Sequence, residues 1–414
     1  MAKQNKPAIR FKGFTDAWEQ RKLGEMGQTY TGLSGKTKDD FGHGRARFVT
    51  YMNVFSNPIS NPEMTEPIEI DPKQNEVEVG DVFFTTSSET PEEVGMSSIL
   101  LEKRGKTYLN SFCFGFRPSE KIDSYYLAYM LRSESARAKI TLLAQGISRY
   151  NISKNKVMEI AVSLPSLDEQ KMIGQYFSQL DHLITLHQRK YDKLQVLKKA
   201  MLEKMFPKNG SSVPEIRFKG FTDAWEQRKL GDFCEMFNGD RSAKYPNEQD
   251  MVHEGIPFIN AGDLENGCVN LLNANKITTE KYNDLGGAKL QLGDIVYCLR
   301  GTLGKNAYID NFSEGTVASS LVAIRPKNID GKYLFYILNS DIEYSQRILH
   351  DEGAAQPNLS AKSVSEFIIP IPNIDEQKKL SSFFDSLSNL ITLHQRELEK
   401  LQNIKKSMLE KMFV

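Results

Sequence analysis

The stretch LPSLDEQKMIGQYFSQLDHLITLHQRKYDKLQVLKKAMLEKMF occupies residues 164–206, and a close copy, IPNIDEQKKLSSFFDSLSNLITLHQRELEKLQNIKKSMLEKMF, occupies residues 371–413. The two stretches are identical at 25 of 43 positions, at a constant offset of 207 residues. Ser166 with Glu169, and Asn373 with Glu376, have the spacing of an N-cap residue and the N3 glutamate that reaches back to it. Each stretch therefore predicts a long helix, and residues 168–206 would span about 58 Å.

Apolar side chains recur at steps of three and four along both stretches, which is the 3.5-residue period of helices that pack on one another. Lys198 and Lys405 interrupt the stripe. Two copies of one unit related by a two-fold axis would place these helices antiparallel. His187 and His394 fall in the stripe, and we interpret them as buried, hydrogen-bonded seam residues rather than metal ligands. The predicted seam comprises Ile173, Phe177, Leu180, Ile184, His187 and Leu194 in the first copy and Leu380, Phe384, Leu387, Ile391, His394 and Leu401 in the second.

A second repeat precedes each half of the chain. FTDAWEQRKLG stands at 14–24 and again at 221–231, and the wider blocks 7–24 and 214–231 match at 17 of 18 positions. The chain is thus a tandem duplication joined by the polar linker PKNGSSVP at 207–214. The aromatic residues of this block, from Phe11 to Trp18 and from Phe218 to Trp225, are expected to pack on the globule or helix. The alternative is that they meet a partner protein.

The regions between the repeats have diverged, and they predict the globular parts of the protein. Residues 78–95 and 291–309 both read as turn, strand and polar loop, and 112–118 and 321–326 as a following strand. Short strands, many turns and a helix or two predict an α+β domain of about 140 residues in each half. The expected division is 1–163, a long helix at 164–207, a second domain at 208–370 with its repeated block from 214, and a second long helix at 371–414.

Composition and motifs exclude several classes of protein. The 53 basic and 53 acidic residues give no net charge, and no apolar run is long enough to span a membrane. Four scattered cysteines indicate a reduced, cytoplasmic protein. No nucleotide-binding loop, methyltransferase motif or metal-ligand cluster is found. Glu169-Gln170-Lys171 and its copy imitate a nuclease motif, but the first turn of a helix favours acidic residues for electrostatic reasons.

The repeated blocks, the G-x-[SA]-x-x-N-[IL]-S stretches leading into [LI]-P-x-[LI]-D-E-Q, and the helices ending in MLEKMF resemble the specificity subunit of type I restriction–modification systems. The resemblance covers the full chain. It implies two target recognition domains, each reading one half of a split site in double-stranded DNA. The long helices would form an antiparallel coiled coil that fixes the spacing and docks two methyltransferase subunits. Restriction subunits would join this core, and S-adenosylmethionine, ATP and Mg would bind to those partners. The chain itself would need no cofactor and catalyse nothing.

Base edges are read by arginine, lysine, amides and hydroxyls, and phosphates are held by cations and hydroxyls, so we looked for these side chains in the loops of each globule. Asn151 and Asn358 could instead cap short helices, and solvated turns are the plainer interpretation for the rest. The candidates are Lys36, Arg45, Arg47, Thr86, Ser87, Arg149, Tyr150, Asn151 and Lys154 in the first globule, and Arg241, Lys244, Tyr245, Arg300, Thr302, Lys305, Asn306, Gln356 and Asn358 in the second.

Two other functions compete with DNA recognition. A non-catalytic adaptor with a coiled-coil strut would suit the neutral net charge. The salt dependence of binding separates it from a DNA-binding protein, because phosphate contacts make affinity fall steeply with salt. An enzyme of unrecognised class would need a nucleophile and a base near the Gly/Thr loops, and the sequence offers no such pair.

Overall fold

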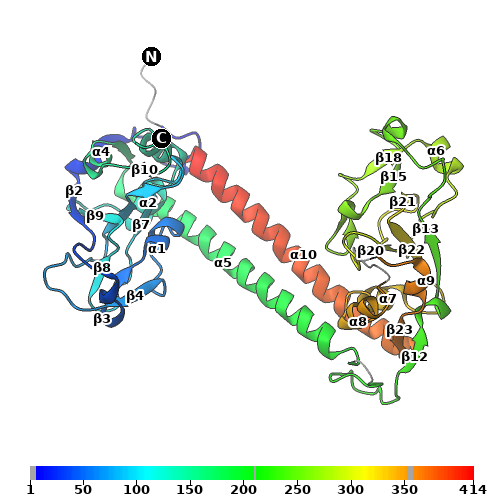
Figure 1. Cartoon of the computed structure of the whole chain (residues 1–414). Helices are drawn as coiled ribbons and strands as arrows, with labels where there is room; N and C mark the ends of the chain where they lie inside the picture. Colours follow the sequence, from blue (N-terminus) through cyan, green and yellow to red (C-terminus); the bar gives the residue numbers. More distant parts are fainter. Residues whose placement is uncertain (1–5, 209–210, 352–357) are drawn as a thin grey trace. The chain divides into compact units, whose positions relative to one another are not determined.

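The computed structural model describes residues 6–208, 211–351 and 358–414 (Figure 1). The chain forms two compact units, Met1–Arg189 with Gln395–Val414 and Lys190–His394, called here the first and second unit. Each unit therefore contains one globule, the beginning of the long helix that follows that globule, and the end of the other long helix. No helix among the described residues is both long enough and apolar enough to cross a membrane.

The two predicted long helices are present as α5 (Leu167–Lys204) and α10 (Ile374–Lys411). Their N-caps are as predicted: Ser166 Oγ accepts from the Glu169 backbone N–H at 3.4 Å, and Asn373 Oδ1 accepts from the Glu376 N–H at 2.9 Å. The reciprocal half of the predicted capping box is replaced, because both glutamate side chains bind arginines of the repeated block.

Two ion pairs connect the N-terminal repeated block of each half to the long helix of that half. Arg10 donates from Nε and Nη2 to the Glu169 carboxylate at 2.6 and 2.7 Å, and Arg217 donates to Glu376 at 2.7 and 2.8 Å. Both carboxylates are almost fully buried, with 1% of each side chain exposed. Each pair fastens the repeated block, residues 7–24 or 214–231 and called here the strut, to the first turn of its helix. In these positions the D-E-Q motif is structural.

The glutamine of the motif fastens the helix to the globule. Gln170 accepts from the Asp123 backbone N–H at 3.0 Å and donates to the Pro165 carbonyl at 2.9 Å. Gln377 makes the same contacts, with the Asp330 N–H at 2.9 Å and the Pro372 carbonyl at 2.8 Å. Asp123 and Asp330 are the N-caps of α2 (Ser124–Met130) and α7 (Gly331–Ile337).

The strut also pairs with the strand that enters the helix. β1 (Glu19–Lys22) runs antiparallel to β11 (Ala161–Leu164), and β12 (Glu226–Lys229) runs antiparallel to β23 (Ile368–Ile371). Farther upstream, the Ile9 N–H donates to the Lys411 carbonyl at 3.0 Å, and the Ile216 N–H donates to the Lys204 carbonyl at 2.9 Å. Each strut thus contacts the start of one long helix and the end of the other.

The aromatic side chains of the strut pack inward, which confirms the packing interpretation for the two tryptophans. Trp18 and Trp225 are buried, and each lies edge-on to a tyrosine of the globule. The ring centroids of Trp18 and Tyr126 are 6.2 Å apart, and those of Trp225 and Tyr333 are also 6.2 Å apart. Phe11 stacks edge-on against Tyr176 of α5 at 6.0 Å. The repeated phrase therefore encodes the joint between globule and helix.

Each globule is built on a four-stranded antiparallel sheet, with a second sheet in which one strand pair is parallel. In the first unit the strand orders are β2-β9-β5-β7 and β4-β3-β8, with a short β6–β10 pair. The further elements are β2 (Gly27–Thr31), β3 (Phe41–Val49), β4 (Thr65–Ile68), β5 (Val82–Thr85), β6 (Ser87–Ser88), β7 (Ser97–Ile99), β8 (Thr107–Leu109), β9 (Cys113–Pro118), β10 (Tyr150–Asn151), α1 (Tyr51–Ser56), α3 (Glu134–Thr141), α4 (Lys154–Met158), η1 (Leu23–Glu25) and η2 (Lys38–Asp40).

The second unit repeats the first sheet and differs in the rest. Its sheet orders are β13-β22-β19-β20 and β14-β18-β15-β21, with a separate β16–β17 pair. The elements are β13 (Cys234–Asn238), β14 (Met251–Val252), β15 (Ile256–Ile259), β16 (Leu264–Glu265), β17 (Cys268–Val269), β18 (Asn275–Ile277), β19 (Ile295–Cys298), β20 (Asn306–Tyr308), β21 (Thr316–Val317), β22 (Leu321–Pro326), α6 (Thr279–Asp284), α8 (Asp341–Leu349), α9 (Ala361–Ser365), η3 (Leu230–Asp232), η4 (Glu248–Asp250) and η5 (Ala261–Asp263).

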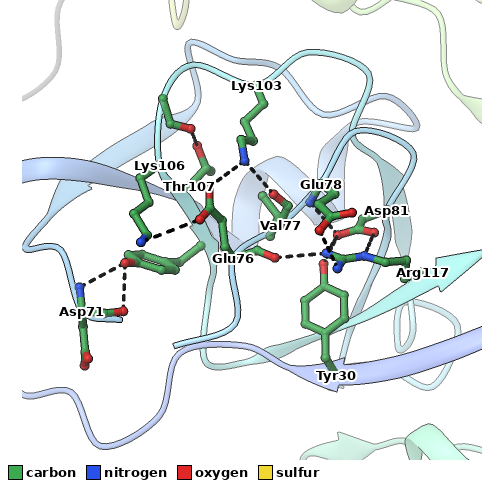
Figure 2. Close-up of polar contacts among 12 residues, drawn as sticks. Tyr30, Asp71, Glu76, Val77, Glu78, Asp81, Lys103, Lys106, Thr107 and Arg117 are labelled. Carbon is green, nitrogen blue, oxygen red and sulfur yellow. Dashed lines mark hydrogen bonds and ion pairs between the residues drawn. The ribbon is translucent and has the colours of Figure 1, made fainter. Parts of the chain in front are cut away.

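A buried aspartate locks the first sheet of each globule. Figure 2 shows Asp81 gripped by Arg117 and Tyr30, with Arg117 donating from Nε and Nη2 to the carboxylate at 2.8 Å each. Asp294 and Arg325 repeat the grip at 2.8 Å and 2.8 Å. Asp81 and Asp294 belong to the shared G-D turn, and Arg117 and Arg325 lie on β9 and β22. This aspartate–arginine pair occupies the same place in both globules, although their sequences differ.

The seam is formed within each unit by the start of one long helix and the end of the other, so the two helices run antiparallel. Ile173, Phe177 and Leu180 are buried in the first unit with Met412 and Phe413, and Leu380, Phe384 and Leu387 in the second with Met205 and Phe206. Ile391 is also buried, whereas Ile184, His187, Leu194, His394 and Leu401 are half-buried. The two histidines are therefore less buried than predicted. The chain is an α+β tandem repeat with paired long helices.

The two lysines that interrupt the seam have polar partners there. In the first unit Lys405 Nζ lies 2.5 Å from Asp181, and the Tyr129 hydroxyl donates to the same carboxylate at 2.8 Å. In the second unit Lys198 donates to Ser388 Oγ at 2.8 Å. Ser388 is the counterpart of Asp181 at the 207-residue offset. The same lysine position therefore meets a carboxylate in one unit and a hydroxyl in the other.

Candidate nucleic-acid interface

Two of the predicted loops of the first unit meet at a short strand junction. β6 pairs antiparallel with β10, with Ser87 opposite Asn151. The Thr86 N–H donates to the Phe112 carbonyl at 2.9 Å, and the Ile152 N–H donates to the Thr86 carbonyl at 2.9 Å. The residues 86–88 and 150–152 are called the first junction.

The second unit contains the same junction in a different sequence. Arg300 forms an isolated antiparallel bridge with Asn358. The Leu299 N–H donates to the Ser320 carbonyl at 2.9 Å, and the Leu359 N–H donates to the Leu299 carbonyl at 3.0 Å. The residues 299–300 and 358–359 are called the second junction. Both junctions begin five residues after the buried aspartate of the G-D turn, so Arg300 holds the place of Ser87.

An arginine is exposed at each junction. Arg149 donates from Nη2 to Ser87 Oγ at 3.2 Å, and its guanidinium lies 5.8 Å from the centroid of the Phe112 ring, which is itself exposed. Arg300 donates from Nε to Asn358 Oδ1 at 3.0 Å. In the described part of the chain neither arginine forms an ion pair, so both keep their charge and several N–H donors for a ligand.

A hollow of about 410 Å³ opens beside Arg149. Its walls combine aromatic, hydroxyl and acidic groups: Tyr51, Met52, Phe55, Ser87, Ser88, Glu89, Glu93, Ser148 and Arg149. The rings of Tyr51 and Phe55 are stacked at 6.0 Å, and Met52 is exposed. The hollow has donors, acceptors and apolar surface, which are the groups that contact the edges of base pairs.

The helix that carries Tyr51, Met52 and Phe55 is held by an arginine that sequence reasoning missed. Arg132 donates from Nη2 to the Val54 and Phe55 carbonyls at 2.8 and 2.9 Å, and from Nε to the Ser97 carbonyl at 2.7 Å. Burial lowers the pKa of Arg132 to about 10. Its charge lies at the C-terminal end of α1, where a cation is favoured. No local signal distinguishes it, because all three acceptors are backbone atoms remote in sequence.

Acidic neighbours already neutralise two of the predicted cations. Lys36 lies 2.9 Å from Asp71 and 3.6 Å from Asp40, and the hydrogen bond to Asp71 raises the pKa of Lys36. Lys244 pairs with Asp284. A phosphate would have to compete with these carboxylates, which weakens the case for both lysines as phosphate ligands.

Other predicted residues point their polar atoms at the protein. Ser87 and Asn306 are buried, and the Asn306 amide donates to the Gly304 and Leu338 carbonyls at 2.8 and 3.0 Å. Further side chains that hydrogen-bond to the protein are Arg47 with Thr65, Arg241 with the Ser319 carbonyl, Lys305 with the Ala261 carbonyl, and Thr86 with the Phe112 carbonyl. The ring of Tyr245 packs edge-on against Phe258.

The remaining candidates stay available or lie outside the described residues. Arg45, Asn151 and Thr302 are exposed, and Tyr150 and Lys154 are half-buried. Gln356 lies outside the described residues. The alternative that Asn151 and Asn358 cap short helices is wrong, because the N-caps of α4 and α9 are Ser153 and Ser360. Within the ranges that the structure describes, no group of three or more His, Cys, Asp or Glu side chains could hold a metal ion.

Comparisons with known proteins agree with this architecture. The family model for the type I restriction modification DNA specificity domain matches residues 15–196 and 222–403. The chain is 26% identical over 325 residues to the type I restriction enzyme MjaVIII specificity subunit of Methanocaldococcus jannaschii, covering 75% of this chain and 74% of that protein. A second relative from that organism, the putative MjaX specificity subunit, is 24% identical over 408 residues, covering 95% and 92% of the two chains.

The fold also matches that of a solved structure. The S subunit of a type I restriction–modification system from M. genitalium superposes with a TM-score of 0.59 at 16% identity, and the match covers 99% of each chain. The buried residues of the D-E-Q helices and the G-D turns fall inside the two ranges matched by the family model.

Proposed function

Since this chain belongs to the family of type I restriction modification DNA specificity domains, we propose that each of its units reads one half of a bipartite DNA site. The chain is the non-catalytic specificity subunit of such a system. The observation that carries the proposal is the repetition of one joint, Arg10–Glu169 and Arg217–Glu376, around two globules that differ in sequence and in their second sheets. A repeated joint holds two different readers in the same way.

We assign methyl transfer and cleavage to methyltransferase and restriction subunits, which would bring S-adenosylmethionine, ATP and Mg. The long helices offer a surface for the methyltransferase subunits. Leu183 and Leu186 of α5 and their counterparts Leu390 and Leu393 of α10 are exposed, and they lie in the segment LITLHQR, which is identical in both copies. One exposed apolar surface presented twice suits two copies of one partner. The assembly would work on DNA in the cytoplasm.

The test is to exchange one reader. Residues 232–370 are replaced by the same region of a relative, and the chain is expressed with its methyltransferase partner in a host without other adenine or cytosine methylation. Methylation-sensitive sequencing of the host chromosome should show one half of the motif changed and the other half retained. A matched exchange of residues 25–163 should change the opposite half. A change of both halves by either exchange would refute independent reading.

A further inference from the structure

We infer that Arg149 and Arg300 are equivalent base-reading residues that recognise a guanine in each half-site and approach their junctions from opposite sides. This inference rests on the proposed function and deepens it. It begins from the alignment of the two junctions by backbone contacts. Ile152 and Leu359 donate to Thr86 and Leu299, at 2.9 and 3.0 Å, in the same way.

The alignment shows that the arginine stands on opposite sides of the junction in the two units. Arg300 occupies the place of Ser87 in the first junction. In the sequence, Arg149 lies 207 residues before Gln356. Each unit therefore carries one arginine among these two positions. In the second unit it stands at the earlier position, as Arg300, and in the first unit it stands just before β10, as Arg149. Each junction thus carries one guanidinium, although the loop sequences around it differ.

Both guanidinium groups are oriented by the opposite strand. Ser87 Oγ holds Arg149 at 3.2 Å, and Asn358 Oδ1 holds Arg300 at 3.0 Å. The Phe112 ring further limits the plane of the Arg149 guanidinium. A guanidinium with a fixed plane and unused N–H groups can donate two hydrogen bonds to O6 and N7 of guanine in the major groove, which is the commonest specific contact of arginine.

The surroundings favour a base over a phosphate. Glu89 and Glu93 line the hollow at Arg149. Carboxylates repel a phosphate but can accept from the amino groups that base edges display. The first junction adds apolar surface from Met52 and the stacked pair Tyr51 and Phe55, which suits the methyl group of a neighbouring thymine.

The first experiment uses the complete complex with its methyltransferase partner. Arg149→Ala should relax one G·C position in one half of the methylated motif, and Arg300→Ala should relax one in the other half. The lysine variants should restore the preference only in part, because a flexible ammonium group replaces the planar, pre-oriented donors of the guanidinium. The unaffected half serves as the folding control in each variant. Equal weakening on all sequences, or relaxation of the same half by both variants, would overturn the inference.

The second experiment probes the contacted atoms on synthetic duplexes that carry the wild-type motif. Replacing the assigned guanine by 7-deazaguanine removes N7 and should weaken the wild-type complex about tenfold, with no further loss in the arginine variant. Replacing it by inosine removes only the minor-groove amino group and should change little. A loss with inosine but not with 7-deazaguanine would contradict major-groove reading.

The two proposals fail in different ways. If the wild-type complex methylates no bipartite motif, the proposed function fails and the arginine variants cannot be compared. If the wild-type complex methylates a bipartite motif and both arginine variants methylate that same motif unchanged, only the assignment of Arg149 and Arg300 is wrong.

Discussion

Arg10 and Glu169 illustrate how a few side chains hold the two repeated blocks together. They are 159 residues apart, and Arg217 and Glu376 have the same separation. With 1% of the Glu169 side chain and 13% of the Arg10 side chain exposed, both charges are largely removed from water. A buried ion pair contributes little more to stability than apolar residues of similar size would. Loss of one partner, however, leaves an unpaired buried charge, which is strongly destabilising.

We therefore expect Arg10→Ala to lower the free energy of unfolding of the first unit by about 3–5 kcal/mol. Arg10→Leu combined with Glu169→Leu should recover most of this loss, because no buried charge remains. Arg217→Ala is the matched variant in the second unit. Hydrogen exchange at the first turn of α5 or α10, together with calorimetry, would locate each effect. Full stability of Arg10→Ala would show that water solvates Glu169.

Sequence reasoning identified the N-caps Ser166 and Asn373 but not the arginine partners of the glutamates. Capping is local, so a spacing of three residues reveals it. The ion pair joins residues from two blocks far apart in the chain, and nothing in either block alone indicates it. The available signal was that arginine and glutamate recur at one separation in both copies, which the offset of 207 residues places in view.

At the scale of elements, Lys198 and Lys405 distinguish the two ends of the helix pair. Lys405 meets the Asp181 carboxylate, whereas Lys198 meets the Ser388 hydroxyl and lies 5.7 Å from the centroid of the Tyr336 ring. Burial lowers the pKa of Lys198. A lysine at a seam position can fix the register of the helices at a cost in stability. We expect the cost to be smaller for Lys405, because its charge is paired with a carboxylate and, among the residues that the structure describes, that of Lys198 is not.

Replacing each lysine by methionine should separate the two roles. Lys405→Met leaves Asp181 without its cation and should cost about 1–3 kcal/mol of unfolding free energy. Lys198→Met removes a buried charge that has only a hydroxyl as its closest partner, and should change stability by less than about 1 kcal/mol. Thermal unfolding of the two variants at neutral pH makes the comparison. A larger loss in Lys198→Met would reverse the assignment.

The pH dependence follows from the same burial. The folded chain releases the Lys198 proton at a lower pH than the unfolded chain, whose lysine keeps the ordinary value of 10.5. Between the lowered pKa and 10.5 the unfolded chain holds more protons, so this group makes the second unit more stable as pH rises through that window.

The long helices were predictable almost to the residue, and the sheets were not. Helical periodicity is local, and α5 and α10 lie inside the predicted segments 164–207 and 371–414, about three residues short of each end. A strand order such as β2-β9-β5-β7 depends on partners far apart in the chain, which an apolar pattern does not specify. The strands after the two G-D turns were recognisable, but their grip through Asp81 and Arg117 required the structure. Asn306 was misjudged because its loop sequence does not reveal which side chains turn inward.

At the scale of the whole molecule, the proposed function predicts that the length of the long helices sets the distance between the two half-sites. Seven residues inserted after both Gln188 and Gln395 would lengthen each helix by about 10.5 Å and keep the phase of the seam, since seven residues are two turns of its period.

DNA rises about 3.4 Å per base pair, so the unread spacer of the methylated motif should grow by about 3 base pairs. Sequencing of the methylated chromosome reads the spacer directly. A four-residue insertion at the same places disturbs the seam phase and serves as a comparison. An active seven-residue variant with the original spacer would show that another element measures the distance.

The contact between Ile9 and the end of α10 has a counterpart between Ile216 and the end of α5. In sequence, residues 1–6 stand where the linker residues 208–213 stand in the other copy. The same backbone contact therefore occurs in both units, so each unit offers an equivalent place to open or close the chain. A circular permutant in which Val414 is joined to Met1 and the chain begins after Lys208 should fold. Together with the methyltransferase partner it should methylate the same motif as the parent. A permutant that folds but reads another motif would mean that chain order, and not the joints, assigns each reader to its half-site.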